Sequence, residues 1–384
     1  MHKVYRILTF FGLTTVHLHL PADQSIQSLE KHGTFLRLSG NFTEAKVVET
    51  KLIDLYTQPA GHVFALNSII TQLTWDETET EYDDALTYHA TKTLEWCESK
   101  TNHKSLATIA NYYCGQANFV LSYYHALRGN YFQAGRRGTA GIEYLETTLL
   151  LDPSLVDAKM HLGIGYYVAD NLPPFIKIFS RLLWFIPTGN SQKSLPYLKD
   201  VMNDGDKYKD VARYLYSTLI IQTPELKAEA TSQLKNLVAL YPTNARFQLR
   251  LMSLLISRKK FEECLITIAD YLRKSSDLKK SDLGLTKIWK ARAHLGLGEL
   301  ELAKKTLSEI HDVFIAQREE LPNWGVAWYM LTKGQLNDLG NNRKMALKNY
   351  KELLVFAEDT YLSGHVVTSA RKGLSQPYQI ISEE

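Results

Sequence analysis

The sequence predicts an all-α protein, an α–α superhelix of helical hairpins stacked side by side. The stretch 226–271 carries the clearest pattern, in which small and large apolar residues recur at helical spacing before a helix-ending proline: Ala230, Leu234, Leu237 and Pro242. A second small residue, Cys264, stands 34 positions after Ala230, and Ile268 stands the same distance after Leu234. Repeats of this length are typical of paired helices that cannot bury their apolar face alone and therefore stack against neighbours.

Length and composition fit this prediction. A chain of 384 residues would ordinarily divide into two or three globular domains, but a repeat array grows lengthwise as one body. Hydrophobic residues make up 45% of the chain and charged residues 22%, as in an ordinary folded protein. The net charge of +3 is small and the basic residues are scattered, which argues against nucleic acid as a partner.

Hairpins can be followed along the chain ahead of this stretch. A first pair of helices is expected at 25–56, with its turn at Gly40-Asn41, and a pair of long helices at 108–151, with its turn at Gly129. Between them, the acidic cluster 76–84 is expected to favour the start of a helix by facing its positive dipole end. A cation site is the alternative there, although no calcium-binding loop pattern is present.

Two further hairpins are expected at 284–310 and 326–356, followed by a closing helix at about 359–374 that caps the array. Glycine, small and aromatic residues fall at the repeat's expected slots in these two hairpins: Gly298, Ala303, Gly334, Ala346 and Tyr350.

The amino-terminal residues have the features of a secretory signal peptide. Basic residues open the chain, an apolar run covers 7–20, and Ala22 offers a small residue for cleavage. We therefore expect residues 1–22 to be a signal peptide and 23–384 to be the repeat domain. The alternative is a buried first helix, because His17 interrupts the apolar run.

A hydrophobic insertion interrupts the repeats at 171–190. Prolines bound a helix of about 12 residues at 175–186, which is too short to span a bilayer. Three interpretations remain for it: a helix lying in a membrane interface, a plug or partner contact in the groove of the superhelix, and a core helix buried against neighbouring hairpins. The candidate membrane or partner contacts are Phe175, Phe179 and Trp184.

Three cysteines stand at positions 97, 114 and 264. An odd count does not form a disulfide framework. Export would allow Cys97 to pair with Cys114 across a hairpin. We nevertheless expect the cysteines to serve as small buried apolar residues, and Cys264 in particular takes a slot where alanine is usual.

No catalytic or metal-binding motif is supported by the residues around it. The motifs HExxH, GxxxxGK and GxSxG do not occur in the sequence. SxxK recurs along the chain, for example at 28–31, 232–235 and 276–279, without its companion motifs, and the 12 histidines are spaced unlike metal ligands. The sequence therefore predicts a non-enzymatic protein with no cofactor and no metal.

The order of the landmarks resembles a widespread, mostly uncharacterised family of exported bacterial tetratricopeptide repeat proteins. The resemblance covers about residues 25–261 and rests on segments in a fixed order: 126–130, 145–146, 151–153, 158–167, 172–174, 187–190 and 237–255. The segment 187–190 departs from the family's Pro-Gly-Gly-Asp step at Thr188 and Asn190. The resemblance implies a tetratricopeptide fold, export to the periplasm and a non-enzymatic role, often in envelope assemblies.

In tetratricopeptide arrays the first helix of each pair lines the concave side, so the slots also predict a surface for a partner. Arginine and aromatic residues suit an extended peptide, because they clamp its carboxylates and backbone. The alternative is that some of these residues pack between repeats. The candidates are Tyr167, Arg246, Leu249, Ile288, Arg292, Trp328 and Gln335.

Three functions follow from these observations. The leading hypothesis is a periplasmic adaptor that binds a protein or peptide, and not nucleic acid, in its concave groove. The second is a protein that docks on a membrane surface through the helix at 175–186. The third is an enzyme hidden in a helical repeat, which would need a clustered acid–base pair in a pocket.

If the helix at 175–186 binds a membrane surface, replacing Phe179 and Trp184 by Asp abolishes flotation of the protein with lipid vesicles. The reason is that charged side chains disfavour insertion at an apolar interface. Circular dichroism of the variant checks that the fold survives. Flotation of the folded variant at the wild-type level would contradict a membrane role for this helix.

Overall fold

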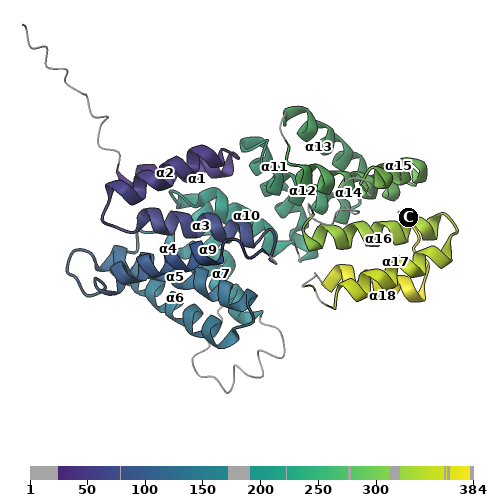
Figure 1. Ribbon diagram of the computed structural model, residues 1–384. Coiled ribbons are helices and arrows are strands. Elements are labelled where there is room, and N and C mark those ends of the chain that lie inside the picture. The colour runs from purple at the N-terminus through teal and green to yellow at the C-terminus, as the bar shows by residue number, and fades with distance from the viewer. Residues whose placement is uncertain are drawn as a thin grey trace, which may run out of the picture.

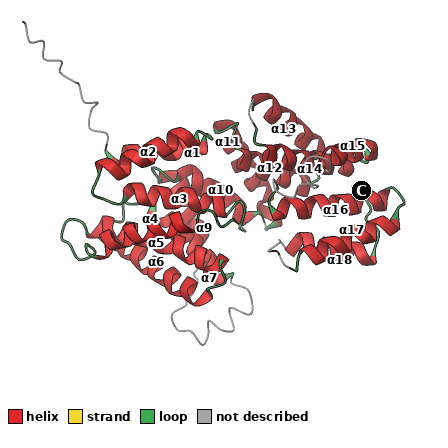
Figure 2. Ribbon diagram, viewed as in Figure 1, coloured by secondary structure: helices red, strands yellow, loops and turns green. Residues whose placement is uncertain are grey.

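The computed structural model describes residues 25–77, 79–171, 191–221, 223–275, 278–310, 321–358, 360 and 364–380. Every regular element within these residues is a helix, and the described chain contains no strand (Figure 2). The predicted all-α fold class is therefore confirmed.

Figure 1 shows the helices in their order along the chain. In chain order they are α1 (Ile26–Leu38), α2 (Phe42–Leu55), α3 (Ala60–Leu73), α4 (Asp83–Glu98), α5 (Ala107–Leu127), α6 (Tyr131–Leu151), α7 (Ala158–Asp170), α9 (Ser191–Asp204), α10 (Lys209–Ile220), the short 3-10 helix η1 (Pro224–Leu226), α11 (Lys227–Leu240), α12 (Ala245–Ser257), α13 (Phe261–Lys274), α14 (Lys280–Gly296), α15 (Leu300–Ile310), α16 (Asn323–Leu339), α17 (Arg343–Phe356) and α18 (Gly364–Ser375).

Helices that are neighbours in sequence are also neighbours in space. They pack as hairpins: α1 with α2, α3 with α4, α5 with α6, α7 with α9, α10 with α11, α12 with α13, α14 with α15, and α16 with α17. The first helices also contact one another in two series, α1–α3–α5–α7 and α12–α14–α16–α18. We call these first helices, together with α10 and α18, the inner layer.

The turns within five hairpins share one backbone arrangement. Two positions after the first helix ends, a residue has a left-handed backbone, and the N–H of the next residue bonds to the carbonyl five positions back. The left-handed residues, with φ between 56° and 84°, are Gly40, Gly129, Lys259, Gly298 and Asn341. The turns predicted at the three glycines are confirmed. Lys259 and Asn341 adopt the same conformation although they carry a Cβ, which is costly for lysine and milder for asparagine.

The small slots of the repeat are fully buried. Ala230, Cys264, Ala303 and Ala346 are each 0% exposed. A small residue at such a slot lets two helices approach closely, and the glycine slots work in the same way. A Cβ at Gly334 would lie 2.5 Å from Cε1 of Tyr350, so the ring occupies the space that a side chain would need.

Segments distant in sequence meet where the chain curls back on itself. Asn244, the residue before α12, donates to the carbonyl of Leu38 at the end of α1 (2.8 Å). Trp324 at the start of α16 donates through Nε1 to the carbonyl of Trp75, just after α3 (3.0 Å). The main apolar core accordingly runs without a break from α1 to the start of α16.

The acidic cluster begins a helix, as predicted. Asp83 and Asp84 lie in the first turn of α4. Asp83 also forms an ion pair with Arg128, with Oδ1 2.6 Å from Nη2 and Oδ2 2.8 Å from Nε. Because its carboxylate is already paired, and because the described residues contain no metal-binding group of three ligands, the cation-site alternative has no support.

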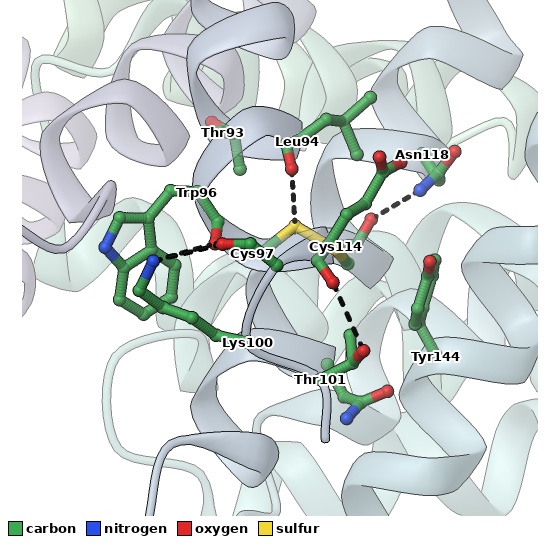
Figure 3. The surroundings of a disulfide bond; sticks show 12 residues. Thr93, Leu94, Trp96, Cys97, Lys100, Thr101, Cys114, Asn118 and Tyr144 are labelled. Carbon is green, nitrogen blue, oxygen red and sulfur yellow. Dashed lines mark hydrogen bonds between the residues drawn. A yellow bond between two sulfur atoms is a disulfide. The ribbon is translucent and has the colours of Figure 1, made fainter. Parts of the chain in front are cut away.

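Cys97 and Cys114 form a disulfide, which corrects the expectation that both are unpaired apolar residues (Figure 3). Cys97 lies in the last turn of α4 and Cys114 in α5, and their Cα atoms are 5.6 Å apart. The odd count misled the prediction, because it does not show which cysteine stays free. Cys264 is the buried free thiol that was expected.

The predicted signal peptide and the insertion at 172–190, including Phe175, Phe179 and Trp184, lie outside the described residues. Among the helices that are described, none has the length and apolar character needed to cross a membrane.

Removing the disulfide by replacing Cys97 and Cys114 with Ala lowers the free energy of unfolding by about 3 kcal/mol, because the bond restricts the unfolded chain over its 17-residue separation. Urea unfolding without reductant measures the loss. Cys264→Ala is the matched control, since it alters a buried cysteine without touching the bond. Dithiothreitol should shift the midpoint of the wild type and of Cys264→Ala. An unchanged wild-type midpoint would show that the bond does not form.

Candidate functional site

Arginine and tryptophan side chains gather on the inner layer of the last hairpins. Trp289 and Arg292 are three positions apart in α14, and Trp328 and Thr332 are four apart in α16, so each pair shares one helix face. Because α14 packs against α16, the two faces meet. The Arg292 Cζ lies 4.3 Å from the ring centroid of Trp328 and 6.0 Å from that of Trp289.

Hydrogen bonds orient the Arg292 guanidinium between these rings. Its Nη1 donates to Thr332 Oγ1 at 3.1 Å and to Gln335 Oε1 at 3.2 Å. The two indole rings stand 5.3 Å apart at an interplanar angle of 57°. We call Trp289, Arg292, Trp328, Thr332 and Gln335 the Arg292 cluster.

The positive charge of the Arg292 cluster has no carboxylate partner within 4 Å among the described residues. Burial lowers the pKa of Arg292 to about 10, so the guanidinium is still charged at neutral pH. Burial, and then Arg292 itself, lowers the pKa of His365, whose ring packs 5.9 Å from that of Trp328. The cluster is therefore electropositive and partly desolvated, which strengthens its attraction for an anion.

Two buried donors in the cluster have no hydrogen-bond partner among the described residues. They are Nε1 of Trp289 and Nε of Arg292. A buried donor without an acceptor costs roughly 1–3 kcal/mol, so an acceptor that reached either atom would be favoured. Arg292 is the more accessible of the two residues, and carboxylate and peptide carbonyl oxygens are the acceptors that suit its guanidinium.

Arg246, another predicted residue, belongs to a separate contact. Its guanidinium lies 4.7 Å from the ring centroid of Trp75, and its Nη2 donates to Gln72 Oε1 at 3.4 Å. Trp75 in turn packs edge-on against Trp324, with 5.3 Å between ring centroids. Burial lowers the pKa of Arg246 to about 10. Arg246 therefore holds α12 against the ends of α3 and α16.

The structure thus brings Arg292, Trp328 and Gln335 together and leaves the other candidates apart. Leu249 and Ile288 are only 3% and 1% exposed and belong to the apolar core, so their assignment to the groove is wrong. Leu249 lies on α12 and Ile288 on α14, and both helices are buried on nearly all sides. The solvent-accessible stripe of each helix is therefore narrower than the slot pattern predicted. Tyr167 is half-buried on α7 and does not adjoin the cluster.

Sequence reasoning missed a buried polar seam that fills the inner layer of the first hairpins. At its centre Lys207 pairs with Glu30 at 2.8 Å, and both side chains are almost completely buried. The Asp157 carboxylate accepts the backbone N–H groups of residues 206, 207 and 208, at 3.0–3.3 Å. Burial alone lowers the pKa of Lys207, but the Glu30 carboxylate raises it overall, so the lysine stays charged.

Tyr208 completes this seam. Its hydroxyl donates to Gln116 Oε1 at 2.8 Å and accepts from Asn67 Nδ2 at 2.8 Å. His161 packs 5.6 Å from the Tyr208 ring, and burial lowers the pKa of His161 to about 3. The inner layer is therefore filled by its own side chains at this point. No local motif signals the seam, because its residues come from distant parts of the chain.

Two hollows on the described surface lie away from the Arg292 cluster. One, of about 490 Å³, is a shallow depression on α2 lined by Phe42, Lys46 and Val47, among others. The other, of about 130 Å³, lies between α5 and α6. Neither contains a pair of groups suited to acid–base chemistry.

Comparisons with known proteins do not place this chain in a family. No protein-family model matches it, and no curated protein is similar to it.

The free energy of unfolding should fall as the pH drops from about 6.5 toward 3, partly because of His161. The folded protein holds this ring neutral, while the unfolded chain binds a proton below its ordinary pKa, so stability present above pH 6.5 is lost on acidification. In the His161→Gln variant the free energy of unfolding should fall less steeply on acidification, by up to about 1.4 kcal/mol per pH unit. Urea unfolding at a series of pH values measures it, with exposed His32→Gln as the control. Parallel curves for His161→Gln and the wild type would contradict this account.

Proposed function

We propose that this protein is a non-enzymatic, tetratricopeptide-like scaffold that binds a peptide segment of a partner protein. The binding surface is the Arg292 cluster on the inner layer of the last hairpins. The observation that carries the proposal is a charged guanidinium without a carboxylate partner in the described chain, framed by two tryptophans and accompanied by two unpartnered buried donors.

The repeat arrangement supports the tetratricopeptide-like part of the proposal. Small residues at the predicted slots are buried at helix contacts, as Ala230 and Cys264 illustrate. Each hairpin packs mainly on its neighbours, and a closing helix, α18, covers the last of them. Proteins built in this way present extended inner surfaces, which are commonly used to hold other proteins.

The chemistry of the Arg292 cluster favours a peptide over a small metabolite. The surface is a row of side chains on adjacent helices and not a closed cavity of the kind that encloses a drug-sized ligand. Tryptophan and arginine are also the residues enriched at the energetic centres of protein interfaces. A carboxylate or main-chain carbonyl of the peptide would accept from the half-buried guanidinium of Arg292.

The proposed location is the periplasm, after export. The disulfide between Cys97 and Cys114 supports an oxidising compartment, because such bonds persist outside the reducing cytosol. The apolar run at 7–20, with its basic start, supplies the sequence argument for export.

Arg292→Gln should reduce recovery of the partner by about tenfold, because the loss of one charge-assisted contact costs on the order of 1.5–3 kcal/mol. The measurement is crosslinking and pull-down from cell envelopes with the chain starting after residue 22. Arg273→Gln is the matched control, since Arg273 is exposed on α13 and pairs only locally with Asp270.

Thermal unfolding of both variants separates lost binding from lost folding. Recovery of the same protein partner by Arg292→Gln and the wild type would overturn the proposed site. Retention of lipid with no protein partner would favour the membrane role instead.

A further inference from the structure

The chain that follows α18 turns back over the inner layer. Residues 376–380 are not helical, and they run from the end of α18 past α16 toward the turn between α14 and α15. The Tyr378 N–H donates to Asp338 Oδ2, in the last turn of α16, at 2.8 Å. Farther on, Cδ1 of Ile380 lies 3.8 Å from where a Cβ on Gly298 would stand.

The acceptor for this segment is held rigidly. The Asp338 side chain is 0% exposed, and its Oδ1 accepts from Arg343 Nη1 at 2.8 Å. Its Oδ2 accepts the Tyr350 hydroxyl as well as the Tyr378 N–H, both at 2.8 Å. Arg343 also donates to the carbonyl of Leu374, where the segment leaves α18. A carboxylate fixed in this way is pre-organised to accept a main-chain N–H.

The segment adjoins the Arg292 cluster. Asp338 lies three positions after Gln335 on α16, so the two side chains share a helix face. Gln335 is in turn an acceptor for Arg292. Burial raises the pKa of Tyr378, and the charge on Arg292 opposes this shift, which places the phenol within electrostatic reach of the guanidinium.

One residue does most of the anchoring. Tyr378 is half-buried, while the other four residues of the segment are exposed. A non-helical stretch that offers one main-chain N–H and one aromatic ring to a helical surface makes the contacts of a bound peptide. Residues 376–380 therefore differ from a buried closing strand, which would place several side chains in the core.

We propose that residues 376–380 are an internal occupant of the peptide surface at the Arg292 cluster. The surface takes an extended segment whose aromatic residue sits beside Arg292 and whose main-chain N–H is received by Asp338. A partner peptide of this class must displace Tyr378 to bind. This inference rests on the proposed function and names the class of its ligand.

Self-occupation has a quantitative consequence. A tethered segment competes at an effective concentration of the order of millimolar, so it weakens the apparent affinity of a peptide that binds the same surface. Removing the aromatic ring of Tyr378 should therefore strengthen the binding of a peptide added in solution.

The test is fluorescence anisotropy with a labelled peptide, Ser-Gln-Pro-Tyr-Gln-Ile, which copies residues 375–380. In the full chain, Tyr378→Ala should bind this peptide at least about tenfold more tightly than the wild type does. Gln379→Ala, an exposed neighbour in the same segment, should bind like the wild type. A peptide with Ala in place of Tyr should not bind any of the three.

A second measurement uses the unaltered chain. Hydrogen exchange of residues 376–380, followed by mass spectrometry, should quicken when the Ser-Gln-Pro-Tyr-Gln-Ile peptide is added in excess, because the segment is displaced. Equal peptide binding by the wild type and a folded Tyr378→Ala, or exchange that the peptide does not change, overturns self-occupation. If Arg292→Gln still reduces partner recovery about tenfold in that case, the proposed function stands without an internal occupant.

Discussion

The structure depends on close contact between helices that cannot bury their apolar faces alone. At each repeat a small residue, such as Ala230 or Cys264, is fully buried where one helix meets another. Larger residues there would hold the hairpins apart and expose the core that they share. The left-handed turns serve the same contact, because each reverses the chain within three residues and keeps the two helices of a hairpin together.

This constraint explains what could be read from the sequence and what could not. Slots such as Ala230 and turns such as Gly129 were predictable, because each rests on local spacing and a residue type with one physical role. Leu249 was misplaced, because the slot pattern identifies a helix pair but not how many neighbours cover its first helix. The pairing of Lys207 with Glu30 leaves no local trace, since it depends on how far the array curls.

The candidate site also has one part that could be predicted from the sequence and one part that could not. Arg292 and Trp328 were predictable from their slots on first helices, and the structure brings them together. The place of Tyr378 near this site was not predictable, because residues 376–380 follow the last repeat and have no periodic pattern. The inner layer therefore has two parts with different chemistry. The first is closed by the charged seam around Lys207, and the second presents an arginine whose charge the described chain leaves unbalanced.

A simple linear array can fray from either end, since each unit is held only by the next. The hydrogen bonds from Asn244 to Leu38 and from Trp324 to Trp75 connect parts of this chain that lie 206 and 249 residues apart. Opening the first hairpin would break contacts of later ones at the same time. The part of the molecule from α1 to the start of α16, which shares one apolar core, should consequently unfold as a single cooperative body, and partial proteolysis should not release a stable first hairpin from it.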